Sequence, residues 1–300
     1  MSAKAAIFVV LAGFTLAYVA AFIASLRRSR TQQRLSPVPA AAHVATGFVT
    51  NFFDTLGIGS FATTTAIFKF GRMVPDELIP GTLNAGHTLP TIFQAFIYIS
   101  AIEVDMLTLV LLIGSAAVGG WVGAGLVAGL SRRTVQLCMG GTLLVAAVAM
   151  LMRQLDLFPP GADSLQLRGW LLAVGVVGNF LIAAISTLGI GFYAPCMTLV
   201  SLLGMNPAAA FPIMMGSSAF LMPLASMRFV WSRVYLAPVA AGLAAGGLLG
   251  VPLAAFVVKS LPLTALRWLV IVVVLYAAAL MLRSVFAAQD HDTSPAPDPV

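Results

Sequence analysis

The pentapeptide Thr55-Leu56-Gly57-Ile58-Gly59 occurs twice in the chain, the second time as Thr187-Leu188-Gly189-Ile190-Gly191, 132 positions further on. The residues that follow the two copies also come in the same order. Each copy is followed by an aromatic residue, by hydroxyl and small residues, by a proline with a small polar cluster, and finally by a glycine-rich apolar stretch. One short match in an apolar chain is weak evidence, but several features in one order indicate an internal duplication.

The composition places both copies in a membrane. Of the 300 residues, 60% are hydrophobic and 9% charged, whereas soluble domains carry roughly 25% charged residues. Residues 169–227 contain no Asp, Glu, Lys, Arg or His, and one bilayer crossing needs about 20 apolar residues. The apolar segments are hydrophobic on all sides, as lipid-facing helices are, and do not alternate as β-barrel strands do. The sequence predicts an all-α integral membrane protein.

The positive net charge does not indicate nucleic acid as a partner. The Lys and Arg residues lie in short loops between apolar runs, where such charges set the orientation in the membrane. We therefore expect the apolar segments to be surrounded by membrane lipid.

The two cysteines, Cys138 and Cys196, fit no disulfide framework or metal pattern, so we expect no metal and no cofactor. The apolar run 5–26 is expected to be a retained helix, because its basic cluster follows it instead of preceding it.

Each copy of the repeated pentapeptide lies in the middle of an unusually long apolar stretch. Residues 35–68 contain only Asp54 as a charged residue, and residues 169–203 contain none. One helix of that length would be about 50 Å long, against a hydrocarbon core of about 30 Å. Two half-helices joined by a glycine turn fit better, as a re-entrant hairpin or as a broken spanning helix. The same glycines could instead serve close helix packing, but their repetition favours the turn.

The loop charges favour the hairpin. If both long stretches turn back, the 16 Lys and Arg residues divide eleven to five between the two sides, and if both cross, nine to seven. The positive-inside rule favours the larger asymmetry. We therefore expect an N-terminal helix with a basic loop at 1–34, a first repeat at 35–153, a second at 168–286 and a disordered tail at 287–300. Each repeat is a re-entrant or broken helical hairpin followed by three transmembrane helices, which makes the repeats inverted.

The two turns are expected to face a shared polar cavity, because unpaired backbone groups are costly in hydrocarbon. Free N–H groups at the following helix start can bind an anion without a buried Arg. For any single Ser or Thr, local backbone bonding is the simpler interpretation, but their concentration favours a substrate pathway. The predicted substrate-binding residues are Asn51, Thr55, Gly57, Ile58, Gly59, Ser60, Thr63, Thr64, Thr82, Asn84, Thr187, Gly189, Ile190, Gly191, Tyr193, Cys196, Ser217 and Ser218.

Asp54 and His87 are titratable residues inside apolar segments. Such residues are functional candidates because burying them is costly. One hypothesis is that the pair relays a proton that accompanies the substrate. The other is that they form structural hydrogen bonds that pin the hairpin.

At these motifs the chain resembles the TauE/SafE family of bacterial permeases. The motif Asp54–Gly59 followed by Ile79–Asn84, and Ser186–Gly191 followed by Gly216–Ser218, are similar to the glycine-rich motif and small polar cluster in each half of that family. The similarity covers residues 40–285. It implies a multi-pass inner-membrane protein, not an enzyme, that moves sulfite, thiosulfate, organosulfonates or related small anions, usually as export.

Other functions remain open at this point. An anion channel could have the same fold. An intramembrane redox carrier would need cysteines at matching positions in the two copies, and Cys138 and Cys196 do not match. A hydrolase using Ser217 or Ser218 with His87 would lack a nucleophile elbow. The spacing of Gly119 and Gly123 fits helix packing within one chain or across a homodimer.

Overall fold

The computed structural model describes residues 3–28, 40–157, 164–189 and 191–257, with six more positions between 271 and 282. Ile190, the loop at 29–39, the tail 287–300 and most of the last predicted helix of the second repeat lie outside these residues. The described part is helical apart from its connections and one isolated β-bridge between Ser164 and Met205. The helices are α1 (Ala3–Arg28), α2 (Ala40–Thr55), α3 (Ser60–Gly71), the short 3-10 helix η2 (Asp76–Leu78), α4 (Ile79–Ala101), α5 (Met106–Val127), α6 (Arg132–Gln154), α7 (Gly169–Ser186), α8 (Tyr193–Leu202), α9 (Pro207–Ser232) and α10 (Ala237–Val257).

Five helices in the described residues, α1, α5, α7, α9 and α10, are long and apolar enough to cross a membrane. The predicted class, an all-α membrane protein, is confirmed at this level. Helix α4 is not among the five, although it has 23 residues. Its sequence is interrupted by a row of buried polar side chains, among them His87, Thr91 and Gln94. Helix α4 therefore packs inside the protein, where its polar groups find partners.

Both repeated pentapeptides interrupt a helix. Their four glycines have positive φ angles of 79° (Gly57), 92° (Gly59), 98° (Gly189) and 97° (Gly191). Residues with a side chain rarely adopt such backbone angles. A backbone hydrogen bond closes each turn in the same way. The Gly57 N–H donates to the Asp54 carbonyl at 2.8 Å, and the Gly189 N–H donates to the Ser186 carbonyl at 3.0 Å. The local sequence thus produces the same turn twice.

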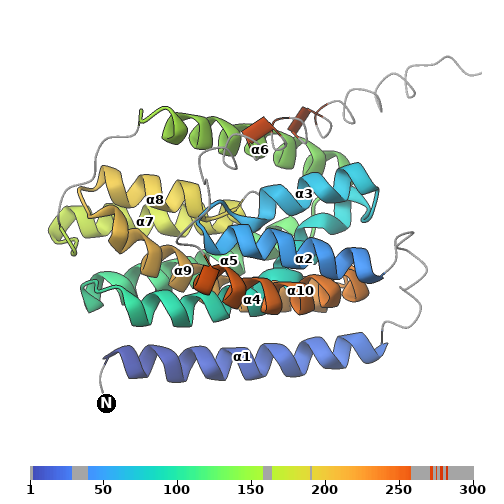
Figure 1. Ribbon diagram of the computed structural model, residues 1–300, viewed down its shortest axis with the longest axis horizontal. Helices are drawn as coiled ribbons and strands as arrows, with labels where there is room; N and C mark the ends of the chain where they lie inside the picture. Colours follow the sequence, from blue (N-terminus) through green and yellow to red (C-terminus); the bar gives the residue numbers. More distant parts are fainter. Residues whose placement is uncertain are drawn as a thin grey trace, which may run out of the picture.

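The two broken helices occupy opposite halves of the molecule (Figure 1). Helices α2 and α3 lie side by side in the half on the right of the view, and α7 and α8 lie in the half on the left. The turn between the two arms of each pair lies near the middle of the structure. Each broken helix therefore enters from one end of the molecule and returns to the same end.

The described residues 40–154 form a first unit and 169–257 a second unit, and helices of the two units pack against each other. Helix α2 of the first unit packs mainly against α10 of the second, and α7 of the second packs against α5 of the first. Helices α4 and α9 contact each other between these pairs, α4 also contacts α10, and α9 also contacts α5. Glycines permit both close approaches: a Cβ atom at Gly246 would lie 1.9 Å from the Val44 carbonyl oxygen, and one at Gly119 would lie 2.3 Å from that of Phe180.

The glycines of α5 therefore pack helices within one chain, and they offer a direct test of this packing. Gly119→Ala is expected to lower the free energy of unfolding by about 2 kcal/mol, because the new methyl group would overlap the α7 backbone. Gly114→Ala in the same helix is the control, since a Cβ there meets nothing within 4 Å. Thermal unfolding of the purified protein in detergent compares the two. Equal stabilities would contradict the close α5–α7 contact.

Candidate functional site

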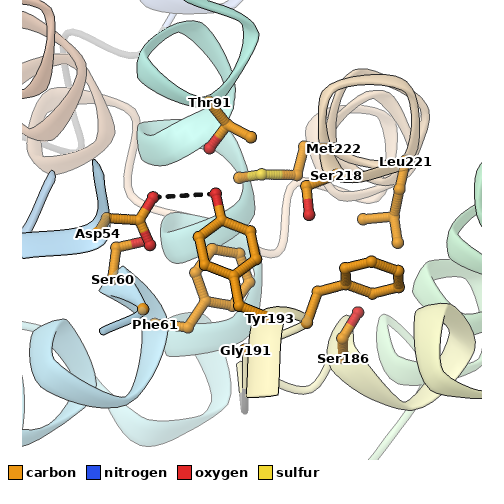
Figure 2. Close-up of a pocket in the computed structure, with 12 residues that line it drawn as sticks. Asp54, Ser60, Phe61, Thr91, Ser186, Gly191, Tyr193, Ser218, Leu221 and Met222 are labelled. Atoms are coloured by element: carbon orange, nitrogen blue, oxygen red, sulfur yellow. Dashed lines mark hydrogen bonds between the residues drawn. The ribbon is translucent and has the colours of Figure 1, made fainter. Parts of the chain in front are cut away.

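A small cavity of about 20 Å³ lies where the two turns meet. This is room for about one water molecule. Its wall is formed by residues of both broken helices, of α4 and of α9 (Figure 2). The lining residues are Asp54, Gly59, Ser60, Phe61, Thr91, Ser186, Gly191, Phe192, Tyr193, Ser218, Leu221 and Met222. Among the described residues, the wall thus contains one carboxyl group, several hydroxyl groups and no Lys, Arg or His.

Asp54 supplies the carboxyl group of this cavity. Its side chain is buried, with 1% of its surface exposed. One carboxyl oxygen, Oδ2, lies 3.1 Å from the Tyr193 hydroxyl. The hydroxyl and the backbone N–H of Ser60, the first residue of α3, also face the carboxyl group. Asp54 therefore sits at the N-terminal end of α3 and contacts the second broken helix through Tyr193.

A hydrogen-bond chain runs from Tyr193 into α4. The Tyr193 hydroxyl donates to Gln94 Oε1 at 2.9 Å, and Gln94 Nε2 donates to Thr55 Oγ1 at 3.0 Å. Thr55 Oγ1 in turn donates to the Asn51 carbonyl at 2.8 Å. The chain joins residues of α2, α4 and α8 that lie far apart in sequence, and it holds the Tyr193 hydroxyl beside the cavity.

His87 lies outside the cavity wall and is fully buried. Its Nδ1 is 3.1 Å from Asn51 Oδ1, and its Nε2 is 3.0 Å from Thr64 Oγ1. Because Asn51 Nδ2 already donates to the Gly47 carbonyl at 2.8 Å, Asn51 Oδ1 is the acceptor and His87 Nδ1 carries the proton. The Thr64 hydroxyl then donates to Nε2. Among the described residues, no hydrogen bond joins His87 to Asp54.

Five of the predicted substrate-binding residues line the cavity, namely Gly59, Ser60, Gly191, Tyr193 and Ser218, together with the predicted proton-coupling residue Asp54. Ile190 lies outside the described residues. The others have structural contacts away from the wall: Gly57 lies against Phe211, Gly189 lies against Leu83 and Met139, and Ile58 and Cys196 lie in the apolar core.

The remaining polar candidates are hydrogen-bonded within the helix framework. Asn51 and Thr64 form hydrogen bonds with His87, and Thr55 accepts one from Gln94. Thr63 and Thr187 donate to carbonyl groups three residues earlier, as the simpler interpretation predicted. Interhelical bonds engage the other three, since Thr82 accepts from the Leu236 N–H, Asn84 donates to the Thr187 carbonyl, and Ser217 accepts from Asn179.

Sequence reasoning missed two important polar residues, Thr91 and Gln94. The signal was present: His87, Thr91 and Gln94 follow the spacing i, i+4, i+7 and so share one face of α4. Ser186 could also have been placed at the site, because it stands at the position of the second copy that corresponds to Asp54. Phe61 and Phe192 are the aromatic residues that follow the two repeated pentapeptides, so the repeat placed them near the turns. Leu221 and Met222 gave no such signal, since apolar residues are common throughout this chain.

Comparisons with protein-family models, with curated proteins and with solved structures found no match to this chain. The function is therefore argued from the cavity and its surroundings.

Proposed function

We propose that this protein is a permease that moves a small sulfur-containing anion, such as sulfite, thiosulfate or an organosulfonate, across the bacterial inner membrane, with export when the outward gradient of the anion exceeds the inward proton gradient. The substrate site is the cavity between the two glycine turns, which widens to admit the anion, since its volume of about 20 Å³ in this structure holds about one water molecule. The observation that carries the proposal is that α3 and α8 both begin at this one cavity. A helix start presents unpaired N–H groups and about half an elementary positive charge, which suits an anion.

The arrangement of the helices also supports a transporter. Broken helices that meet near the middle of a membrane protein are a recurrent way to build a substrate site. We take the two units to be inverted repeats, each a re-entrant hairpin followed by three transmembrane helices. The ends of α1, α3 and α9 and the start of α6 then lie on the cytoplasmic side, because ten of the 16 Lys and Arg residues lie in or beside them. Movement of one unit against the other would open the cavity to each side in turn.

The cavity chemistry favours coupling to protons. An anion that enters the cavity meets the Asp54 carboxyl group, and no cationic side chain lines the wall. Two like charges about 4 Å apart repel by about 4 kcal/mol at an effective dielectric constant of 20. Protonation of the carboxyl group removes this repulsion. We therefore expect the anion to cross together with a proton.

The test is uptake into proteoliposomes that contain the purified full chain. Sulfite, thiosulfate, sulfoacetate, sulfate and acetate are compared with and without an inward proton gradient. We expect saturable uptake of at least one sulfur-containing anion, stimulated by the gradient and by the same anion trapped inside. Uptake without stimulation from the trapped anion would indicate an anion channel instead. If none of the anions moves, the proposal is wrong.

A further inference from the structure

We infer that the two turns have different roles: Asp54 acts as an internal anion at the start of α3, and the substrate anion binds at the start of α8 beside Ser218 once Asp54 carries a proton. This inference rests on the proposed anion transport. It names the half of the cavity that holds the substrate and the residue that couples transport to protons.

The first turn already has an anionic partner. The Asp54 carboxyl group faces the Ser60 hydroxyl and backbone N–H, which are the groups that an external anion would use at the start of α3. The second turn has no such partner, because Ser186 occupies the position that corresponds to Asp54. The two turns have the same backbone shape, but the first has the Asp54 carboxyl group where the second has the Ser186 hydroxyl.

The second turn has a free donor aimed into the cavity. Ser218 on α9 has 3% of its surface exposed, and its hydroxyl has no hydrogen-bond partner among the described residues. Figure 2 shows this hydroxyl pointing into the space between Tyr193 and Ser186. A buried hydroxyl without a partner is costly, and an anion at the start of α8 would accept its hydrogen bond. The Tyr193 and Ala194 N–H groups at the start of α8 supply the other donors, because Pro195 has no N–H and the Cys196 N–H donates to the Phe192 carbonyl.

The hydrogen bonds around Asp54 fit a protonated carboxyl group. The Tyr193 hydroxyl has one hydrogen and two neighbouring acceptors, Gln94 Oε1 at 2.9 Å and Asp54 Oδ2 at 3.1 Å. The bond from Gln94 Nε2 to Thr55 turns Oε1 towards Tyr193. If Asp54 is ionised, the Tyr193 hydroxyl can donate to only one of these two acceptors, and Ser60 and Gln94 remain as donors beside the carboxylate. If Asp54 is protonated, it donates to Tyr193, Tyr193 donates to Gln94, and every group is paired.

The groups that face Asp54 do not provide a counter-charge. They are Ser60 from α3, Gln94 and Tyr98 from α4, and Tyr193 from α8. None of them is cationic, so only a proton neutralises the carboxylate. The stoichiometry follows: one proton binds Asp54 as one anion binds at α8, both are released on the other side, and Asp54 is left ionised at the start of α3.

Three variants test the inference in thiosulfate and sulfoacetate transport by proteoliposomes. Asp54→Asn is expected to keep exchange of the anion for the same anion, and to lose proton-driven accumulation and its dependence on pH. Asp54→Ser copies the residue of the second turn and is expected to behave in the same way, so that a folding defect of one variant does not decide the outcome. Ser218→Ala is expected to raise the half-saturation concentration about tenfold without changing the pH dependence.

Ser115→Ala is the control, because the Ser115 hydroxyl donates only within its own helix, to the Leu112 carbonyl. Size-exclusion profiles and circular dichroism confirm that each variant is folded. Proton-driven accumulation that persists in both Asp54 variants would overturn the inference and leave anion transport standing. Loss of exchange in both folded Asp54 variants would also overturn it, since Asp54 would then be needed for binding. If the wild-type protein moves no anion, the proposed function itself fails.

Discussion

Gly59→Ala is expected to lower the transport rate about 100-fold in a protein that still folds. Gly59 has a φ of 92° and a ψ of 134°, a conformation almost restricted to glycine, and it directly precedes α3. A Cβ there would meet nothing within 4 Å, so the effect comes from backbone strain alone. Strain of about 3 kcal/mol would shift the turn and move the start of α3 away from the cavity. A cost of that size, placed on the transport-competent state, corresponds to about 100-fold in rate.

The matched control for this prediction is Gly114→Ala, which also adds a methyl group in open space but at a glycine in the middle of α5. It is expected to retain the wild-type rate. Gly191→Ala repeats the test in the second turn, where φ is 97° and the nearest atom to a Cβ would be 3.9 Å away. Initial rates of uptake are compared at equal amounts of reconstituted protein. A Gly59→Ala protein with wild-type rate and stability would show that the bend does not need glycine.

His87→Leu is expected to lower the free energy of unfolding by about 3 kcal/mol. The imidazole is fully buried and is hydrogen-bonded through both nitrogens, to Asn51 and to Thr64. Leucine fills much of the space but leaves Asn51 Oδ1 and the Thr64 hydroxyl without partners, and each such group costs about 1–3 kcal/mol. The measurement is denaturant or thermal unfolding in detergent, followed by the pH dependence of the transport that remains.

The more conservative His87→Gln separates a structural role from a role in proton transfer. An amide can still donate to Asn51, so this variant is expected to recover part of the stability and to keep the wild-type pH profile. This follows from the position of His87 outside the cavity wall and without a hydrogen bond to Asp54. A stable His87→Gln protein with no pH dependence would instead place His87 in the proton path.

Much of the membrane architecture could be predicted from local sequence. The length of the apolar stretches indicated helices in a bilayer, and the repeated Gly-x-Gly motif indicated where two of them break. Both inferences depend on short-range physics, namely the cost of charge in hydrocarbon and the positive φ angles of Gly57, Gly59, Gly189 and Gly191. The polar residues that line the cavity were predicted less well, because hydroxyl side chains such as those of Thr63 and Thr187 can bond their own helix instead.

The sequence by itself determined the class of protein, the two turns and the unusual position of Asp54, because each depends on residues close together in the chain. Only the tertiary structure decided which side chains share the site. Tyr193 meets Asp54 across 139 positions, Gln94 meets both broken helices from α4, and the Ser218 hydroxyl beside α8 has no partner in the part of the chain that the structure describes. These contacts depend on how α4 of the first unit and α9 of the second pack against each other. That packing depends on glycine contacts between helices distant in sequence, which a local pattern does not specify.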